Sequence, residues 1–198
     1  QKERVKGIVD IYPAMNPLGV DSITRGVPGF DIDMNRIFPG SEEGAVTEHI
    51  ATQIMEDISG ADFCVDIHAS NIFLREILQV RMSEGTAEQL LPYAKLLNTD
   101  FIWVHGAATV LESTLAHGLN TSGVPTVVVE MGVGMRITKS YGLRLTEGIL
   151  CLMKRLGIWE GETIAPKEPM TSDNRKIGLV HANTAGIFLP SMEHQGMV

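Results

Sequence analysis

The sequence contains only two cysteines, Cys64 and Cys151, among its 198 residues. Each cysteine lies inside an apolar run, so we interpret both as buried free thiols and expect no disulfide between them. No apolar run approaches the roughly 18–20 residues that a membrane-spanning helix requires. These absences argue against a disulfide-stabilised scaffold and an integral membrane protein, and they predict a protein of the reducing cytoplasm.

Positive charge is scarce as well. The chain has 16 Lys and Arg against 24 Asp and Glu, which gives a formal net charge of -8, and no cluster of basic residues stands out. A nucleic acid or an anionic membrane would be bound through such a cluster. We therefore expect neither a nucleic acid nor a membrane as a partner.

The six histidines form no local metal-binding pair. A catalytic zinc normally has three protein ligands, yet the spacings H-x-x-E, E-x-x-H and H-x-x-x-H are all missing. The sequence also begins at Gln1 without a methionine and stops at Val198 within a Gly-rich segment. We therefore expect it to be an internal piece of a longer protein.

Strand-like and helix-like patterns alternate along the chain. The strands that we expect are short apolar runs at residues 5–13, 61–70, 71–80, 100–105 and 125–132. The helices that we expect lie at residues 43–59, 86–97, 113–123 and 138–159. This alternation predicts an α/β fold of three layers, with helices on both faces of a mixed, largely parallel sheet.

Local features refine this assignment. The Pro- and Gly-rich residues 13–43 are expected to form one long loop, which is either functional or disordered. Gly60 fits the C-terminal cap of the helix before it. The buried face of that helix is expected to consist of the residues at four-residue spacing, Val46, Ile50, Ile54 and Ile58.

Composition divides the chain into three parts. Residues 1–158 are expected to form the α/β domain, and residues 159–175, rich in Glu, Pro, Thr and Ser, a linker. Residues 176–198 look like the start of a small β domain.

Polar side chains close several of the expected strands. His68 follows the run FCVDI, His105 follows FIWV, and Glu130 follows TVVV. In open α/β sheets, ligands bind outside the carboxyl ends of the strands. The long loop at residues 13–43 also follows a strand end, so we expect its polar groups and these three residues to converge on one crevice.

Two of these residues have simpler interpretations. His68 could be a strand-end histidine that makes one hydrogen bond, and Glu130 could cap the helix that follows it. If Glu130 is instead a general base, its position at an apolar strand would raise its pKa toward the working range.

The long loop carries groups that suit an anionic ligand. Arg36 offers a bidentate guanidinium for a carboxylate, and Asn35 adds an amide donor. Arg25 could instead aim its charge at a carbonyl oxygen that becomes an oxyanion. The simpler interpretation is a set of ion pairs within the loop, with Asp31 and Asp33, and both interpretations can hold together.

The order of short motifs resembles one known family. The motifs are NPLG at 16–19, Arg25, DIDMNRIFPG at 31–40, VDIH at 65–68 and VVVEMG at 127–132. Over residues 5–155 this order resembles the succinylglutamate desuccinylase/aspartoacylase family, the deacylase branch of the zinc carboxypeptidase-like fold. The resemblance implies a zinc-dependent hydrolase that cleaves the amide bond of a small anionic N-acylated substrate, with one zinc per complete chain.

The resemblance also implies a role for each site residue. His68 matches the family's third zinc ligand, and Glu130 matches the carboxylate that takes a proton from the zinc-bound water. Arg25 matches the arginine that polarises the scissile carbonyl. Asn35 and Arg36 match the pair that holds the carboxylate of the substrate.

The sequence departs from the family pattern at its N-terminus. The family carries its first two zinc ligands in an H-G-x-E motif before the strand expected at residues 5–13, and that motif is missing here. Two further ligands are therefore expected upstream of Gln1. The segment after residue 176 resembles only the opening of the family's C-terminal β domain.

Three functions are consistent with these observations. We favour a deacylase of N-acyl amino acids or related small N-acylated amines. The alternatives are a metallocarboxypeptidase that acts on peptides and a metal-free binding module, and a homo-oligomer is compatible with each. The residues that could line the substrate pocket, or else be structural, are His105, Glu112, His117 and Tyr141.

Overall fold

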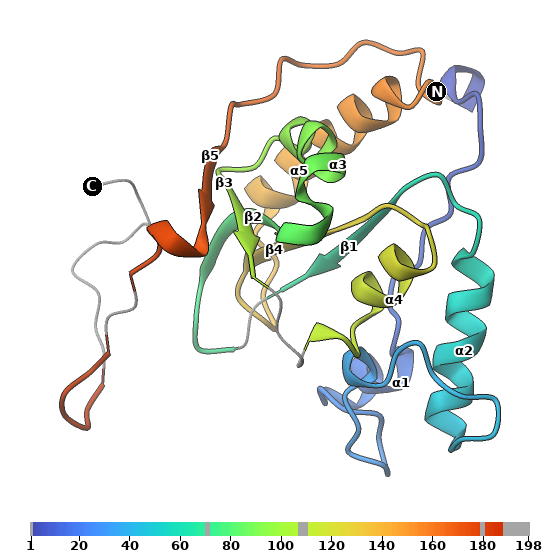
Figure 1. Cartoon of the computed structure of the whole chain (residues 1–198), viewed down its shortest axis with the longest axis vertical. Coiled ribbons are helices and arrows are strands. Elements are labelled where there is room, and N and C mark those ends of the chain that lie inside the picture. The colour runs from blue at the N-terminus through green and yellow to red at the C-terminus, as the bar shows by residue number, and fades with distance from the viewer. Residues whose placement is uncertain (1, 70–71, 107–110, 179–180, 188–198) are drawn as a thin grey trace.

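The computed structural model describes residues 2–69, 72–106, 111–178 and 181–187 (Figure 1). Within these residues, a sheet of five strands has the order β1-β4-β2-β3-β5. The strands are β1 (Cys64–His68), β2 (Glu76–Ser83), β3 (Phe101–His105), β4 (Thr126–Gly132) and β5 (Met170–Asp173).

The pairing of the strands confirms the predicted mixed, largely parallel sheet. β4 runs parallel to β1 and antiparallel to β2. β3 runs parallel to both of its neighbours, β2 and β5.

Helices cover both faces of this sheet and give the three layers that the sequence predicts (Figure 1). One face packs against α3 (Glu84–Ala94) and α5 (Lys139–Arg155). The other face packs against α4 (Leu115–Thr121), and α2 (Val46–Ile58) packs in turn on α4. The short helix α1 (Pro17–Ser22) and the 3-10 turn η2 (Met34–Arg36) lie within the segment that was expected to be loop throughout.

The two faces of the sheet differ in chemistry because side chains alternate along each strand. The face under α3 and α5 is apolar: Val80, Ile102, Val127 and Val129 are completely buried there. Full burial of each such side chain contributes about 1.5–3 kcal/mol to folding.

The opposite face of the sheet is polar. In the pairing register, Glu130 of β4 stands beside His68 of β1 and Gln79 of β2. Arg81 lies two residues after Gln79, so the same alternation places its side chain on this face as well. The register of β4 therefore fixes which charged groups meet.

The prediction of a strand at residues 5–13 is wrong. Only Val5 makes a bridge, to Trp159, and residues 6–12 belong to no strand. Ile8 and Ile11 are largely exposed. A β-branched run becomes a strand only when a neighbouring backbone completes its hydrogen bonds, and none of the described strands pairs with residues 6–12.

The prediction of the buried face of the helix at 43–59 is wrong for the first half of the helix. α2 begins at Val46, and its buried residues are Thr47, Ala51 and Ile58. Val46 and Ile50 are exposed. Ala51 and Ile58 belong to one apolar cluster with Leu115 and Leu119 of α4, so packing between the two helices sets which side of α2 is buried. Gly60 has a φ of 81°, as its predicted capping position requires.

The domain boundaries stay a prediction. Strand β5 lies within the segment assigned to the linker, and it extends the sheet by pairing with β3. Most of the predicted small β domain at 176–198 falls outside the described residues.

A charged network ties this segment to the domain. The Asp100 carboxylate accepts hydrogen bonds from both terminal nitrogens of Arg144, at 2.9 and 3.0 Å, and from Lys167 Nζ at 2.7 Å. Burial alone would raise the pKa of Asp100, but the hydrogen bonds from Arg144 and Lys167 lower it below the ordinary value of 3.8.

Asp100→Asn is expected to lower the free energy of unfolding by about 1.5–3 kcal/mol, the typical worth of hydrogen bonds to a charged group. Because the pKa is lower in the folded state, the contribution of Asp100 is complete above pH 3.8 and is lost as the pH falls through the folded value. Urea denaturation at neutral and acid pH measures this difference. Asp21→Asn, on exposed α1, is the matched control, and an equal effect of both variants would contradict the prediction.

None of the described helices is both long enough and apolar enough to cross a membrane.

Candidate active site

A hollow of about 870 Å³ lies over the polar face of the sheet. Strand residues, the loop before η2, and α4 with the segment before it form its walls. Asn120 joins α4 to β4, because its amide accepts from Thr126 N at 3.0 Å and donates to Thr126 O at 2.9 Å. The hollow is lined by all five predicted site residues, which are Arg25, Asn35, Arg36, His68 and Glu130.

Asp33 organises the loop part of the site. Its Oδ2 accepts from Arg25 Nε at 3.0 Å and from Arg25 Nη2 at 2.9 Å, while its Oδ1 accepts from Asn35 N at 3.0 Å. The buried side chains of Met34 and Phe38 anchor the same loop in an apolar cluster that also contains residues of α2 and α4. The predicted ion pair within the loop is thus present for Arg25, and it holds the guanidinium at the hollow.

Asn35 and Arg36 lie side by side at the rim. The side-chain oxygen of Asn35 accepts from Leu115 N, the first residue of α4, at 2.9 Å. Its amide nitrogen makes no hydrogen bond to the described part of the chain. Arg36 is exposed and donates one hydrogen bond, from Nη1 to the backbone oxygen of Asn35 at 2.6 Å. The remaining donors of both residues suit an anionic group.

His68 is the last residue of β1, as predicted, and stands next to a carboxylate. Its Nε2 lies 3.0 Å from Asp66 Oδ2, two residues earlier on the same face. Burial of the ring opposes protonation, but the carboxylates of Asp66, Glu130 and Asp33 outweigh it and raise the pKa of His68.

Glu130 lies inside β4, two residues before its end, and is mostly buried. Its Oε1 lies 3.7 Å from Arg81 Nη1. Burial raises the pKa of Glu130, and the positive charges of Arg81 and His68 offset this only in part. A carboxylate with a raised pKa is suited to exchange protons near neutral pH.

Several buried polar atoms here lack a hydrogen-bond partner within the described residues: Asp66 Oδ2, His68 Nε2, Arg81 Nε and Glu130 Oε2. The contact between Asp66 and His68 has the length of an ion pair but not the alignment of a hydrogen bond. An unsatisfied buried polar atom costs about 1–3 kcal/mol, so this cluster suits a polar ligand or a metal ion.

The zinc site expected from the sequence is not complete in these residues. An imidazole nitrogen is a regular zinc ligand, and His68 Nε2 is available for that role. The described ranges, however, contain no group of three His, Cys, Asp or Glu that could hold a metal ion. His68 alone does not make a metal centre.

Residues 1–156 match the succinylglutamate desuccinylase/aspartoacylase catalytic domain. The chain belongs to this family. A curated relative, the N-alpha-acetyl-L-2,4-diaminobutyric acid deacetylase of Halomonas elongata, is 30% identical over 183 residues, which cover 84% of this chain and 50% of the relative.

Solved structures of similar proteins share the fold. The product-bound structure of the ectoine utilization protein EutE (DoeB) from Ruegeria pomeroyi has a TM-score of 0.77 and 23% identity, covering 86% of this chain and 53% of that one. A succinylglutamate desuccinylase/aspartoacylase from Rhodobacter sphaeroides has a TM-score of 0.73 and 25% identity, covering 86% and 52%. The chain therefore spans about half the length of the relatives that it matches.

The family resemblance did not point to Arg81 and Glu76, which also line the hollow. The signal was present in the alternation of β2, where Gln79, Arg81 and Ser83 share one face. Glu76 joins that face because the pairing with β4 is irregular between Glu76 and Gln79. Such β-bulges re-aim a side chain and are common next to active sites.

Four residues were left open by the sequence as either pocket-lining or structural, and the structure distinguishes them. His105, Glu112 and His117 line the hollow. Tyr141 instead lies under the guanidinium of Arg75, with 5.8 Å between Arg75 Cζ and the centre of the ring.

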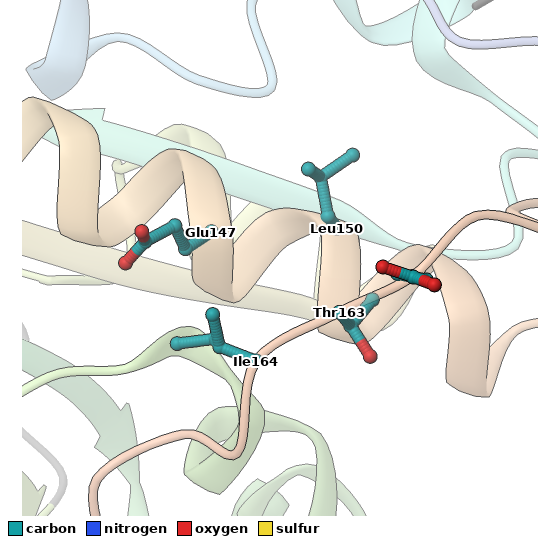
Figure 2. Close-up of a pocket in the computed structure, with 5 residues that line it drawn as sticks. Glu147, Leu150, Thr163 and Ile164 are labelled. Atoms are coloured by element: carbon teal, nitrogen blue, oxygen red, sulfur yellow. The ribbon is translucent and has the colours of Figure 1, made fainter.

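A second, smaller hollow of about 240 Å³ lies between α5 and the segment after it (Figure 2). Glu147 and Leu150 of α5 line it together with Glu162, Thr163 and Ile164, and none of the predicted site residues takes part. The predicted site residues thus all line the larger hollow.

Proposed function

We propose that the chain forms part of a zinc-dependent hydrolase that cleaves the amide bond of an N-acyl amino acid or a related small N-acylated amine. One observation carries the proposal: the hollow gathers an anion-binding pair, a second arginine, a histidine and a buried carboxylate around one space. Membership of the deacylase family and the similarity to a deacetylase support it.

Glu130 is the proton carrier in this proposal. A water oxygen adds to the amide carbon and transfers a proton to the Glu130 carboxylate. As the carbon–nitrogen bond breaks, Glu130 returns that proton to the leaving amine. The products are a carboxylic acid and a free amine, and Glu130 ends the cycle ionised.

The arginines act on opposite parts of the substrate. Arg25, held by Asp33, stabilises the negative charge that develops on the carbonyl oxygen. Arg36 and the amide nitrogen of Asn35 bind the carboxylate of the substrate, which fixes the amide relative to Glu130.

Zinc is the metal that we propose, with one ion per complete chain. His68 would supply one ligand, and at least one other would have to come from outside the described residues, which contain no set of three. When bound, zinc supplies Lewis-acid character and lowers the pKa of a water molecule. We also propose a cytoplasmic location, in which the free thiols Cys64 and Cys151 stay reduced.

The test uses the intact protein that contains this chain, assayed with N-acetyl amino acids and with dipeptides. Release of the amino acid from N-acetyl substrates, lost on chelation and restored by zinc, is the expected result. Turnover of dipeptides instead would indicate a metallocarboxypeptidase. Binding of N-acetyl amino acids without zinc and without turnover would indicate a binding module.

Arg36→Ala is expected to raise KM about 10- to 100-fold and to leave kcat nearly unchanged. Hydrogen bonds to charged groups are worth about 1.5–3 kcal/mol, and an anchor far from the reacting bond contributes equally in the ground and transition states. Steady-state kinetics of the intact enzyme measure both constants. Arg155→Ala, at the exposed end of α5, is the control, and an unchanged KM in Arg36→Ala would reject the anchor role.

A further inference from the structure

Among the described residues that line the hollow, Arg81 is the arginine that the proposed mechanism leaves without a role. It extends from β2 on the polar face of the sheet, where β2 separates β4 from β3. Its side chain is 28% exposed, and its Nε is fully buried with no hydrogen-bond partner in the described part of the chain. A largely buried charge needs partners that compensate for the lost water, so the neighbours of Arg81 show what the residue can do.

Glu76 and Trp103 hold the Arg81 guanidinium in place, and Gln79 in turn holds Glu76. Nη2 donates to Glu76 Oε2 at 2.6 Å, and Gln79 Nε2 donates to the same oxygen at 2.7 Å. The guanidinium also lies over the ring of Trp103, 5.2 Å from its centre. Charge-assisted hydrogen bonds and a cation–π contact together fix the fork of an arginine in one orientation.

The fixed guanidinium points its other terminal nitrogen at Glu130. Arg81 Nη1 lies 3.7 Å from Glu130 Oε1, while Glu130 Oε2 is buried with no hydrogen-bond partner within the described residues. The two oxygens of the carboxylate are therefore not equivalent. One faces a fixed cation, and the other remains available to accept a proton.

We propose that Arg81 is a positioning residue for Glu130. Its guanidinium, held by Glu76 and Trp103, fixes one oxygen of the Glu130 carboxylate and leaves the other to exchange the proton. This inference rests on the proposed role of Glu130 in amide hydrolysis.

A second use of Arg81, direct binding of a substrate anion, is less favoured by the contacts. Arg81 already lies between two carboxylates, Glu76 and Glu130. An added anion would meet both of them at short range, where like charges repel strongly. Arg25 and Arg36 at the rim have more exposed guanidinium groups for that purpose.

The experiment combines variants in a double-mutant cycle on the intact enzyme. Arg81→Met and Arg81→Lys are measured alone, and Arg81→Met is also measured together with Glu130→Gln. Arg144→Met is the matched control, because Arg144 is similarly buried, at 29% exposed, and is paired with Asp100 outside the hollow. Urea denaturation of each variant monitors the fold.

Arg81→Met is expected to lower kcat about 100-fold, as a misplaced catalytic group does, with KM nearly unchanged. Arg81→Lys should recover part of that loss. In the Glu130→Gln background, Arg81→Met should cost nothing further, because a residue that acts only through Glu130 has no effect once the carboxylate is gone.

Three kinetic outcomes would overturn the inference: a rise in KM without a fall in kcat, additive losses in the double variant, or an equal loss in Arg144→Met. A parent protein without amide hydrolase activity would reject the proposed function instead. In that case a crystal structure of Arg81→Met tests the positioning role of Arg81 directly. A Glu130 carboxylate that keeps its position without Arg81 would overturn the inference. A displaced Glu130 carboxylate would support it.

Discussion

Replacing Glu130 by glutamine is expected to lower kcat by about 100- to 10,000-fold, the usual contribution of a general acid–base group. Glutamine has the shape of glutamate but cannot accept and return the proton. KM should change little, because in the proposed mechanism the substrate carboxylate is held elsewhere, by Arg36 and Asn35. Steady-state kinetics of the intact enzyme on an N-acetyl amino acid measure the effect.

The control for this variant is Glu160→Gln, which removes an exposed carboxylate paired with Lys6 on the surface. It should keep the parent's kcat. A kcat of Glu130→Gln within about tenfold of the parent would fall below the usual effect of a general base and would remove Glu130 from that role.

Arg25→Ala is expected to raise the activation barrier by about 2.7–4 kcal/mol, which corresponds to a loss of about 100- to 1,000-fold in kcat. In the proposed mechanism the charge of Arg25 acts on the carbonyl oxygen only as the oxyanion develops, so the loss should fall on kcat more than on KM. Asp33→Asn should give a smaller loss in the same direction, because it loosens the guanidinium without removing it.

Arg175→Ala provides a close control for Arg25→Ala. The contacts Arg25 Nη2–Asp33 Oδ2 and Arg175 Nη2–Asp173 Oδ2 are both 2.9 Å long, and the two arginine side chains are 72% and 87% exposed. Arg175 lies outside the residues that line the hollow. Equal activity of the two variants would show that the Arg25 contact is only an ion pair of the loop.

The sequence was sufficient to predict that several strand ends and the long loop gather at one place. Apolar runs that end in a polar residue placed His68 and His105 at strand ends, and the structure confirms both positions. The rule that sites form at these ends then predicted that the loop residues Arg25 and Arg36 would join His68 at one place. They line one hollow, although the chemical role of each residue is still a prediction.

Other features depended on information that the local pattern does not carry. Helix α2 buries Ala51 and Ile58 in a cluster with Leu115 and Leu119 of α4, while Val46 and Ile50 stay exposed, so packing between helices decides its rotation. Glu76 reaches the polar face only through a bulge in β2, and strict alternation would have placed it on the other side. Such effects arise from contacts between elements, which a single sequence does not reveal.

The register of β4 limits which insertions and deletions the sequence can tolerate. Val127 and Val129 fill the core under α3 and α5, while Glu130 faces the hollow between the partners His68 and Gln79. A one-residue insertion or deletion before Glu130 within the strand would exchange these two faces. It would place a carboxylate in the apolar core and a valine in the hollow, so stability and chemistry would be lost together. Length variation among descendants of this sequence should therefore be confined to loops, while β4 keeps its length.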